Sequence, residues 1–168
     1  MAYKKRCWGD GDPVSEKYHD EEWGTPLKGD NEFFERLSLE MFQAGLSWRT
    51  ILHKRQAFRK AFANFSIKRV AGFTQRDIKK LLNDKSIIRN ELKIKSVIFN
   101  ANVFLQLKAE FGSFEKWLET VDVNDADVYK VFKKHFKFMG PEVVKSFLMS
   151  IGKIPSWHGK NCWKYRRN

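Results

Sequence analysis

Signals that begin and end helices recur about every dozen residues in this sequence, whereas alternating apolar and polar residues, which mark half-buried strands, are nearly absent. Asp12 followed by Pro13 is typical of a helix start, because the aspartate can cap the first turn and proline fits the first helical position. The helix that follows is predicted to reach about Trp23, and Gly24 can close it. The pattern predicts an all-α protein built from short helices.

Further along the sequence, apolar residues recur at spacings of three and four, as they do on the buried face of a helix. Capping residues, prolines and glycines bound these stretches, and the longest runs from Glu91 to Phe111. The predicted helices are 30–45, capped by Asp30 or Asn31 with Phe33, Phe34, Leu37, Met41 and Ala44 as its core face, 47–60 capped by Ser47, one begun by the capping box of Thr74 and Asp77, 91–111 before Gly112, 125–135, and 141–151 begun by Pro141.

The 168 residues are enough for one compact core, so we expect a single domain over residues 1–168. The net charge of +12 favours a polyanionic partner, and residues 49–95 and 129–168 carry net charges of +11 and +9. No apolar stretch approaches the length of a membrane span and no signal-like segment follows Met1, so we expect no membrane partner and a cytoplasmic location. A charged helical surface without a nucleic-acid partner stays open as the alternative.

Two cysteines and two histidines stand near the two ends of the sequence, Cys7 and His19 near one, His158 and Cys162 near the other. Two thiolates and two imidazoles are a ligand set that holds zinc in a closed tetrahedral site. Zinc bound here would join the irregular segment 153–168 to the other end of the chain. A disulfide between Cys7 and Cys162, or two buried free thiols, are alternatives that the spacing leaves open.

The carboxylate of Glu40 lies in an aromatic and apolar stretch that breaks at Gly45 and resumes with Trp48. A carboxylate among apolar side chains costs free energy unless it meets a cationic or hydrogen-bonding partner, so Glu40 is a candidate ligand-binding residue. Arg36 precedes Glu40 by four residues, so an exposed ion pair on one helix face is the simpler interpretation. Trp48 likewise has a simpler interpretation, as a core residue.

Residues 84–94 predict a tight turn between two helices, apolar at its tip and basic at its end, inside the basic segment 49–95. Turns of this kind direct backbone amides and basic side chains toward phosphates, as in the helix-hairpin-helix elements that bind a nucleic-acid backbone without reading its sequence. An ordinary connection between two helices is the alternative.

Several short motifs follow one another along the sequence: the specific YHDEEWG at 18–24 and QAGLSW at 43–48, and the shorter Arg6-Cys7, Asp12-Pro13, IIR at 87–89, FKFMGP at 136–141 and His158-x3-Cys162. Together, and in this order, they resemble the bacterial 3-methyladenine DNA glycosylase I family over nearly the whole sequence. The resemblance implies an all-α, helix-hairpin-helix DNA glycosylase-like bundle with its hairpin at about 84–94. It also implies one structural Zn²⁺ per chain, with Cys7, His19, His158 and Cys162 tying residues 1–20 to 153–168.

The same resemblance implies a monofunctional DNA glycosylase of base-excision repair, which flips 3-methyladenine out of alkylated double-stranded DNA and hydrolyses the N-glycosidic bond to leave an abasic site. Glu40 would be the catalytic residue that reads the base, and Leu46 would lie at the gap left by the flipped nucleotide. No nucleotide cofactor is implied, and we expect a monomer. The base pocket would comprise Tyr18, Trp48, Trp8 and Trp23, and the other DNA contacts Ser86, Arg89, Asn90 and Lys93.

Two other functions stay open: a zinc-containing protein of the same fold that binds damaged DNA without cutting it, and a glycosylase for a different alkylated base. The sequence also departs from the family pattern. Trp8 follows Cys7 directly, Ser15 stands where a tyrosine is common, and Ser86 replaces a usual glycine, so the pocket wall and the hairpin turn are the places to test. The region 117–136 is short for the family, and the basic end segment of Lys164, Tyr165, Arg166 and Arg167 is expected to supply compensating phosphate contacts.

Overall fold

The computed structural model describes residues 4–165, and within that range helices alternate with loops and no strand forms, which confirms the predicted all-α fold. In the same range, no helix is both long and apolar enough to cross a membrane. The elements in chain order are α1 (Pro13–Lys17), the π-helical turn η1 (Tyr18–Glu22), α2 (Asp30–Gln43), α3 (Trp48–Ala61), the 3-10 turn η2 (Ala63–Phe65), α4 (Ile67–Ala71), α5 (Gln75–Asn83), α6 (Glu91–Phe111), α7 (Phe114–Glu119), α8 (Val128–His135) and α9 (Pro141–Ser150).

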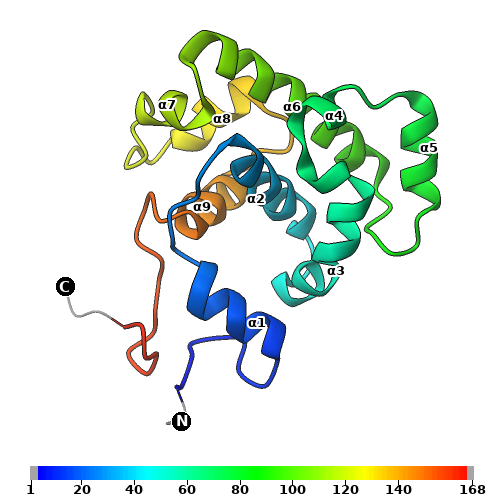
Figure 1. Cartoon of the computed structure of the whole chain (residues 1–168). Helices are drawn as coiled ribbons and strands as arrows, with labels where there is room; N and C mark the ends of the chain where they lie inside the picture. Colours follow the sequence, from blue (N-terminus) through cyan, green and yellow to red (C-terminus); the bar gives the residue numbers. More distant parts are fainter. Residues whose placement is uncertain (1–3, 166–168) are drawn as a thin grey trace.

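Helix α2 lies at the centre of the molecule and packs against α3, α6 and α9 (Figure 1). From this helix Phe34 meets Phe104 of α6, and Phe42 meets Phe58 of α3, with ring centroids 5.4 and 4.6 Å apart. Burying a ring of this size stabilises a fold by about 1.5–3 kcal/mol. The core is thus built around α2 by phenylalanines from several helices: Phe33, Phe34, Phe42, Phe58, Phe62, Phe65, Phe104, Phe114, Phe132 and Phe147.

Several helices begin at the capping residues that the sequence predicts. The side chain of Asp12 accepts a hydrogen bond from the first turn of α1, with Pro13 at the first helical position. Ser47 does the same for α3, and Thr74 and Asp77 form the predicted capping box of α5. These bonds satisfy backbone amides that the first turn of a helix leaves unpaired, so they are local and readable from sequence.

Other boundaries differ from the prediction. The residue at the cap of α2 is Gly29, and Asp30 instead accepts a hydrogen bond from the backbone amide that begins α7. Helix α8 begins at Val128, three residues later than predicted. Ala44, predicted on the core face, lies beyond the end of α2 and is exposed. The sequence analysis also missed α4 and α7, because five and six residues are too few to show a helical period.

The two end segments of the described chain lie side by side, at the lower left of Figure 1. The segment after α9 has no helix, as predicted, and the amide of Trp163 donates to the carbonyl of Lys5. Near its start the segment passes so close to Gly24 that a Cβ atom on Gly152 would lie 2.7 Å from the Gly24 carbonyl oxygen. Glycine at 152 therefore allows the two segments to meet. Of the predicted basic end segment, Arg166 and Arg167 lie outside the described residues.

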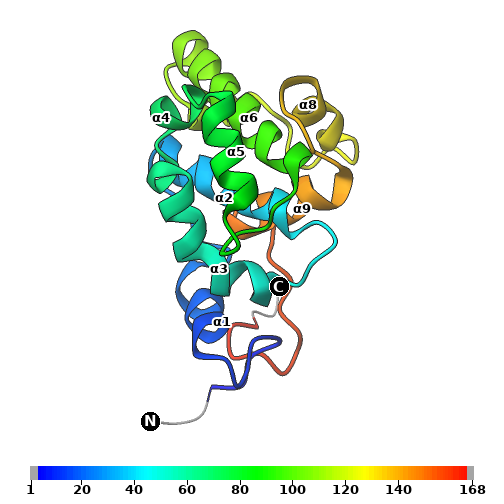
Figure 2. The same ribbon diagram turned by 90° about the vertical axis from the view of Figure 1, so that its right-hand side faces the viewer.

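Seen from the side, the turn between α5 and α6 lies near the loop between α2 and α3 (Figure 2). The Lys54 ammonium of α3 joins this turn by donating to the Ser86 carbonyl, 3.0 Å away. The basic segment 49–95 thus folds so that α3, α5 and the start of α6 surround one turn.

We expect Gly152→Ala to destabilise the protein more than Gly11→Ala does. Both glycines have positive φ, +72° and +83°, but a Cβ atom meets nothing within 4 Å at Gly11, whereas at Gly152 it meets a backbone carbonyl. Left-handed backbone alone costs about 1–2 kcal/mol, and the clash adds to that cost at position 152. Urea unfolding measures both free energies, and equal losses would show that the close approach to Gly24 does not constrain the fold.

Candidate functional site

A cavity of about 170 Å³ opens between α2, α3, α9 and the segment that contains α1 and η1. An apolar cavity of about 150 Å³ is enough to hold a benzene ring, so this one suits a single flat base. The structure gathers here every residue that was predicted for the pocket, Trp8, Tyr18, Trp23, Glu40 and Trp48, and three that were not, Gln43, Ser146 and Met149. Ser146 and Met149 are three residues apart and therefore lie on the same face of α9, which is the one feature of the sequence that could have placed them together.

Four aromatic rings form the walls of this cavity. Tyr18 and Trp48 have centroids 5.2 Å apart, and Trp8 packs edge-on against Trp23 at 5.4 Å. Trp8 thus reaches the pocket although it follows Cys7 directly in the sequence. Ser15 does not line the cavity: it is buried and donates to Asp12 at the start of α1. The pocket therefore has tryptophan faces available to a planar ligand.

Two buried polar atoms of the pocket have no hydrogen-bond partner among the described residues, the hydroxyl of Tyr18 and Nε1 of Trp48. Buried polar groups in native proteins are nearly always paired, so an unpaired one in a cavity is a position where a ligand can bind. Tyr18 is protonated there, because burial raises the pKa of its hydroxyl. The cavity thus offers one hydroxyl and one indole N–H to a bound molecule.

Glu40 lies in the same cavity and is only 5 % exposed. Burial raises the pKa of its carboxyl group to about 7, while the positive charge of Arg36 and a hydrogen bond with Ser150 oppose the rise. Arg36 is itself buried, donates to the Ser150 carbonyl at 3.0 Å and lies 3.4 Å from a Glu22 oxygen. The interpretation of Glu40 and Arg36 as an exposed ion pair is therefore wrong.

A larger depression of about 500 Å³ adjoins the cavity and shares Glu40, Gln43 and Ser146 with it. Its rim includes the loop after α2, where Gly45 has a φ of +83° and the side chain of Leu46 is 40 % exposed. The side chain of Leu46 therefore stands at the mouth of the pocket rather than in the core.

The turn between α5 and α6 exposes three of the predicted DNA contacts, Ser86, Arg89 and Asn90. Ser86 donates from its amide and its hydroxyl to the Asp84 carboxylate. No residue from 84 to 90 has positive φ, so a serine fits where the family usually has glycine. Asn90 caps α6 by accepting from the Lys93 amide at 3.0 Å.

Lys93, the fourth contact predicted for this hairpin, is placed differently. Its side chain is buried, and its ammonium group donates to the backbone carbonyls of Phe42 and Ala44 at 3.0 and 2.7 Å. The prediction of a phosphate contact here is corrected, because the charge is used inside the protein.

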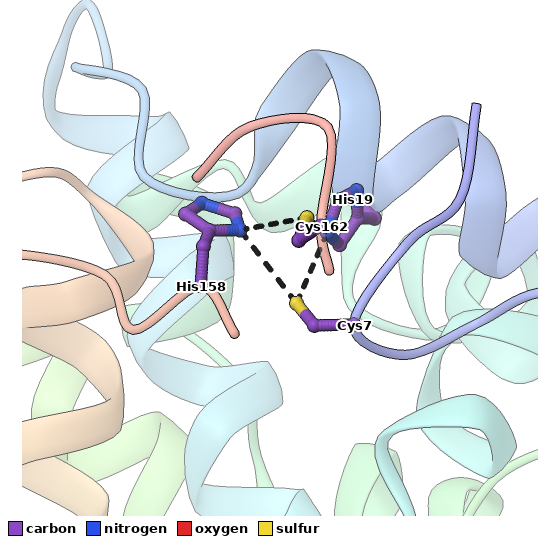
Figure 3. Close-up of side chains that lie close together, drawn as sticks. All are labelled: Cys7, His19, His158 and Cys162. Carbon is purple, nitrogen blue, oxygen red and sulfur yellow. Dashed lines mark hydrogen bonds between the residues drawn. The ribbon is translucent and has the colours of Figure 1, made fainter. Parts of the chain in front are cut away.

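Cys7, His19, His158 and Cys162 meet where the two end segments join, and Figure 3 shows their four ligand atoms facing one point. His19 Nε2 lies 3.4 Å from both sulfur atoms, and His158 Nδ1 lies 3.6 Å from Cys7 Sγ and 3.4 Å from Cys162 Sγ. Tetrahedral zinc with ordinary bond lengths separates sulfur from nitrogen by about 3.5 Å. Both cysteines are free, so no disulfide forms, and the four residues fit a metal ion.

The second nitrogen of His19 also has a partner. His19 Nδ1 lies 2.9 Å from Asp20 Oδ1, and Asp20 in turn accepts hydrogen bonds from the Arg6 guanidinium and from the Trp163 indole. A carboxylate at the outer nitrogen fixes the ring orientation and the tautomer of a metal-binding histidine. The ligand set is thus held in place by both end segments.

The same architecture occurs in solved DNA glycosylases, which gives the class of this fold. 3-Methyladenine DNA glycosylase I from Staphylococcus aureus is 34% identical and superposes with a TM-score of 0.84, over 95% of this chain and 96% of that one. A variant of a 3-methyladenine DNA glycosylase I solved in complex with 3-methyladenine also is 34% identical, with a TM-score of 0.84 and coverage of 95% and 97%.

Sequence comparison narrows the class. Residues 8–134 match the methyladenine glycosylase family, and the chain belongs to this family. DNA-3-methyladenine glycosylase 1 of Escherichia coli (strain K12) is 32% identical, in a match that covers 98% of each chain.

We expect the Glu40→Gln variant to become more stable relative to the wild type as the pH rises. Below the ordinary pKa of 4.5, both the folded and the unfolded protein hold the proton. Above the folded pKa of about 7, the folded protein must bury an anion, which costs about 3 kcal/mol that a glutamine does not incur.

Urea unfolding of both proteins at pH 5 and pH 8 measures this change, since other titrating groups cancel in the comparison. Glu110→Gln, on an exposed face of α6, serves as the control and should show no such growth. A Glu40 difference that is the same at both pH values would refute the buried, proton-binding carboxylate.

Proposed function

We propose that this protein is a DNA glycosylase that removes 3-methyladenine from alkylated double-stranded DNA in base-excision repair and leaves an abasic site. The observation that carries the proposal is a buried carboxylate, Glu40, in an aromatic cavity sized for one base. The glycosylases that this chain resembles support it. A base inside a duplex cannot reach such a cavity, so it must first be flipped out of the stack.

Glu40 and the tryptophans favour a methylated base over an ordinary one. A 3-methyladenine nucleotide carries a positive charge, which interacts with the faces of tryptophan rings and with a carboxylate. The cation also stabilises the charged form of Glu40 and thereby lowers its pKa from about 7. Neutral adenine offers neither interaction, so it does not offset the cost of a buried anion.

The positive charge also makes the bond easy to break. The C1′–N bond of the nucleotide breaks with both electrons going to the base, which leaves as a neutral molecule and needs no proton from the protein. The sugar becomes an oxocarbenium ion, and the nearby Glu40 carboxylate stabilises this charge. Water then adds its oxygen to C1′ and releases one proton.

The exposed groups around the pocket would bind the rest of the DNA. Leu46, at the mouth of the pocket, would fill the gap left by the flipped nucleotide. Ser86, Arg89 and Asn90 of the hairpin would contact phosphates without reading sequence, as in helix-hairpin-helix proteins. The protein would act as a single domain and a monomer, in the cytoplasm, where it meets the DNA.

Cys7, His19, His158 and Cys162 would hold one structural zinc ion. Zinc would supply a rigid link between four side chains and would take no part in the reaction, because protein atoms fill all four ligand positions. Trp8 and Trp23, which line the pocket, pack against His19. His158 packs against Trp23 at 4.7 Å, so the metal site supports one wall of the pocket.

Excision tests the proposed activity directly. Methylated duplex DNA is incubated with the wild type, Glu40→Gln, Glu40→Ala and the control Glu110→Gln, and the released bases are quantified. We expect release of 3-methyladenine by the wild type and the control, and a loss of about 100-fold or more in Glu40→Ala. Full activity of Glu40→Gln would show that excision does not need the carboxylate of Glu40.

The same experiment separates the other functions. Tight binding of methylated DNA with no base released by the wild type would favour the non-catalytic damage-binding protein. Release of a different alkylated base in preference to 3-methyladenine would favour the glycosylase with another substrate.

Metal analysis tests the zinc site. We expect one zinc per purified chain, and loss of the metal in Cys162→Ser with a decrease in Tm of roughly 10 °C, because the two end segments are no longer joined. His135→Gln, which changes a histidine outside the cluster, should keep the metal. Stoichiometric zinc in Cys162→Ser, or none in the wild type, would refute the site.

A further inference from the structure

Lys93 is a charged side chain that the proposed mechanism does not use. It is only 7 % exposed, and it binds the backbone of Ala44, which lines the depression next to the pocket. Its Nζ atom donates to the carbonyl oxygens of Phe42 at 3.0 Å and Ala44 at 2.7 Å. A buried ammonium group is costly unless it is paired or hydrogen-bonded. The burial of this charge on two backbone carbonyls therefore points to a structural role for Lys93.

The two carbonyls that Lys93 binds belong to the end of α2. The last carbonyls of a helix have no partner within the helix, and a positive charge at this end is favourable. Gly45 follows immediately with positive φ, and Leu46 comes next, with its amide donating to the Gln43 carbonyl at 2.7 Å. Lys93 thus fixes the backbone from which the Leu46 side chain projects.

The backbone of Lys93 is fixed from the other direction by the hairpin. Its amide donates to the side chain of Asn90, which caps α6 and is exposed in the turn. The Ser86 carbonyl of the same turn accepts from Lys54 of α3, a helix that begins at Trp48, two residues after Leu46. Lys93 therefore contacts both the turn that would meet phosphates and the loop that would enter the DNA, and Lys54 holds the same turn against α3.

We propose that Lys93 is a positioning residue that sets the Leu46 loop at a fixed distance from the phosphate-binding hairpin. The inference rests on the proposed function, because it links the two parts that would contact DNA, the hairpin and the Leu46 loop. When the hairpin binds phosphates, the link brings Leu46 to the base stack in one register. Misplacing a group by about 1 Å can lower a rate about 100-fold, so the link affects base flipping although Lys93 touches no DNA.

Lys93→Met removes the ammonium group and keeps most of the side-chain volume. We expect single-turnover excision of 3-methyladenine from duplex DNA to fall about ten- to 100-fold. Affinity for the free base 3-methyladenine, followed by tryptophan fluorescence, should change less than about three-fold, since no pocket residue is altered. Lys95→Met, on an exposed side of the same helix, is the matched control and should leave both measurements unchanged.

Salt dependence separates positioning from a direct phosphate contact. In binding to a duplex with a stable abasic-site analogue, Arg89→Ala should reduce the slope of log Kd against log salt by about 0.9, the change for one lost phosphate contact. Lys93→Met should leave that slope unchanged and lower the preference for abasic over undamaged DNA about ten-fold. This preference needs no excision, so it tests Lys93 even if the wild type proves to release no base and the proposed activity fails.

A double-mutant cycle tests the route through Leu46. If Lys93 acts by holding the Leu46 loop, then adding Lys93→Met to Leu46→Ala should lower the abasic preference no further. Lys93→Arg, which keeps a charged donor, should restore part of the loss.

Three outcomes would overturn the proposal. Additive losses in the double variant would mean that Lys93 acts elsewhere, and a smaller salt slope would make it a phosphate contact. A loss of free-base affinity as large as the loss of abasic preference would make Lys93 a residue that only stabilises the fold of α2.

Discussion

Holding a carboxylate out of water, in the last turn of the central helix, is the constraint around which this structure is arranged. Glu40 is buried with Arg36 one turn away, and Arg36 shares Glu22 with Arg55 of α3, whose guanidinium also binds Glu35. Buried or half-buried charges are tolerated when each has an opposite charge or a hydrogen bond. The network crosses η1, α2 and α3, so the elements that form the pocket are also the elements that balance its charge.

These opposing effects place the pKa of Glu40 at about 7, so both protonation states are accessible near neutral pH and a ligand can favour one of them. Burial favours the neutral carboxyl group, while Arg36 and Ser150 favour the carboxylate. A cationic ligand tips this equilibrium with little additional energy, whereas a neutral one does not. In the proposed function, selectivity for a charged base thus comes from the arrangement around Glu40 rather than from a tight fit to the shape of one base.

Features that depend on neighbouring residues could be predicted from the sequence, and features that depend on distant packing could not. The caps at Asp12, Ser47 and Thr74 are local bonds, and the two cysteines and two histidines form a set that fits a metal ion, which is readable from the residue types. The exposed pairing of Arg36 and Glu40 was wrong because α2 is covered on all sides by other helices, so helical period does not reveal an exposed face. The predicted DNA contact of Lys93 was wrong for the same kind of reason. Its partners are backbone carbonyls about 50 residues earlier in the sequence, and no pattern of side chains predicts such a contact.

The joining of the end segments has a consequence for the order in which the protein matures. Cys7 and His158 are 151 residues apart, so contacts between them form only after a ribosome has released nearly everything in between. Trp23 packs against His158, and Trp8 packs against Trp23. This side of the cavity therefore lacks its support until His158 is in place. A chain truncated directly after α9 therefore keeps every described helix of the core while its tryptophan wall lacks its support, so the helical core can be complete before the base pocket is.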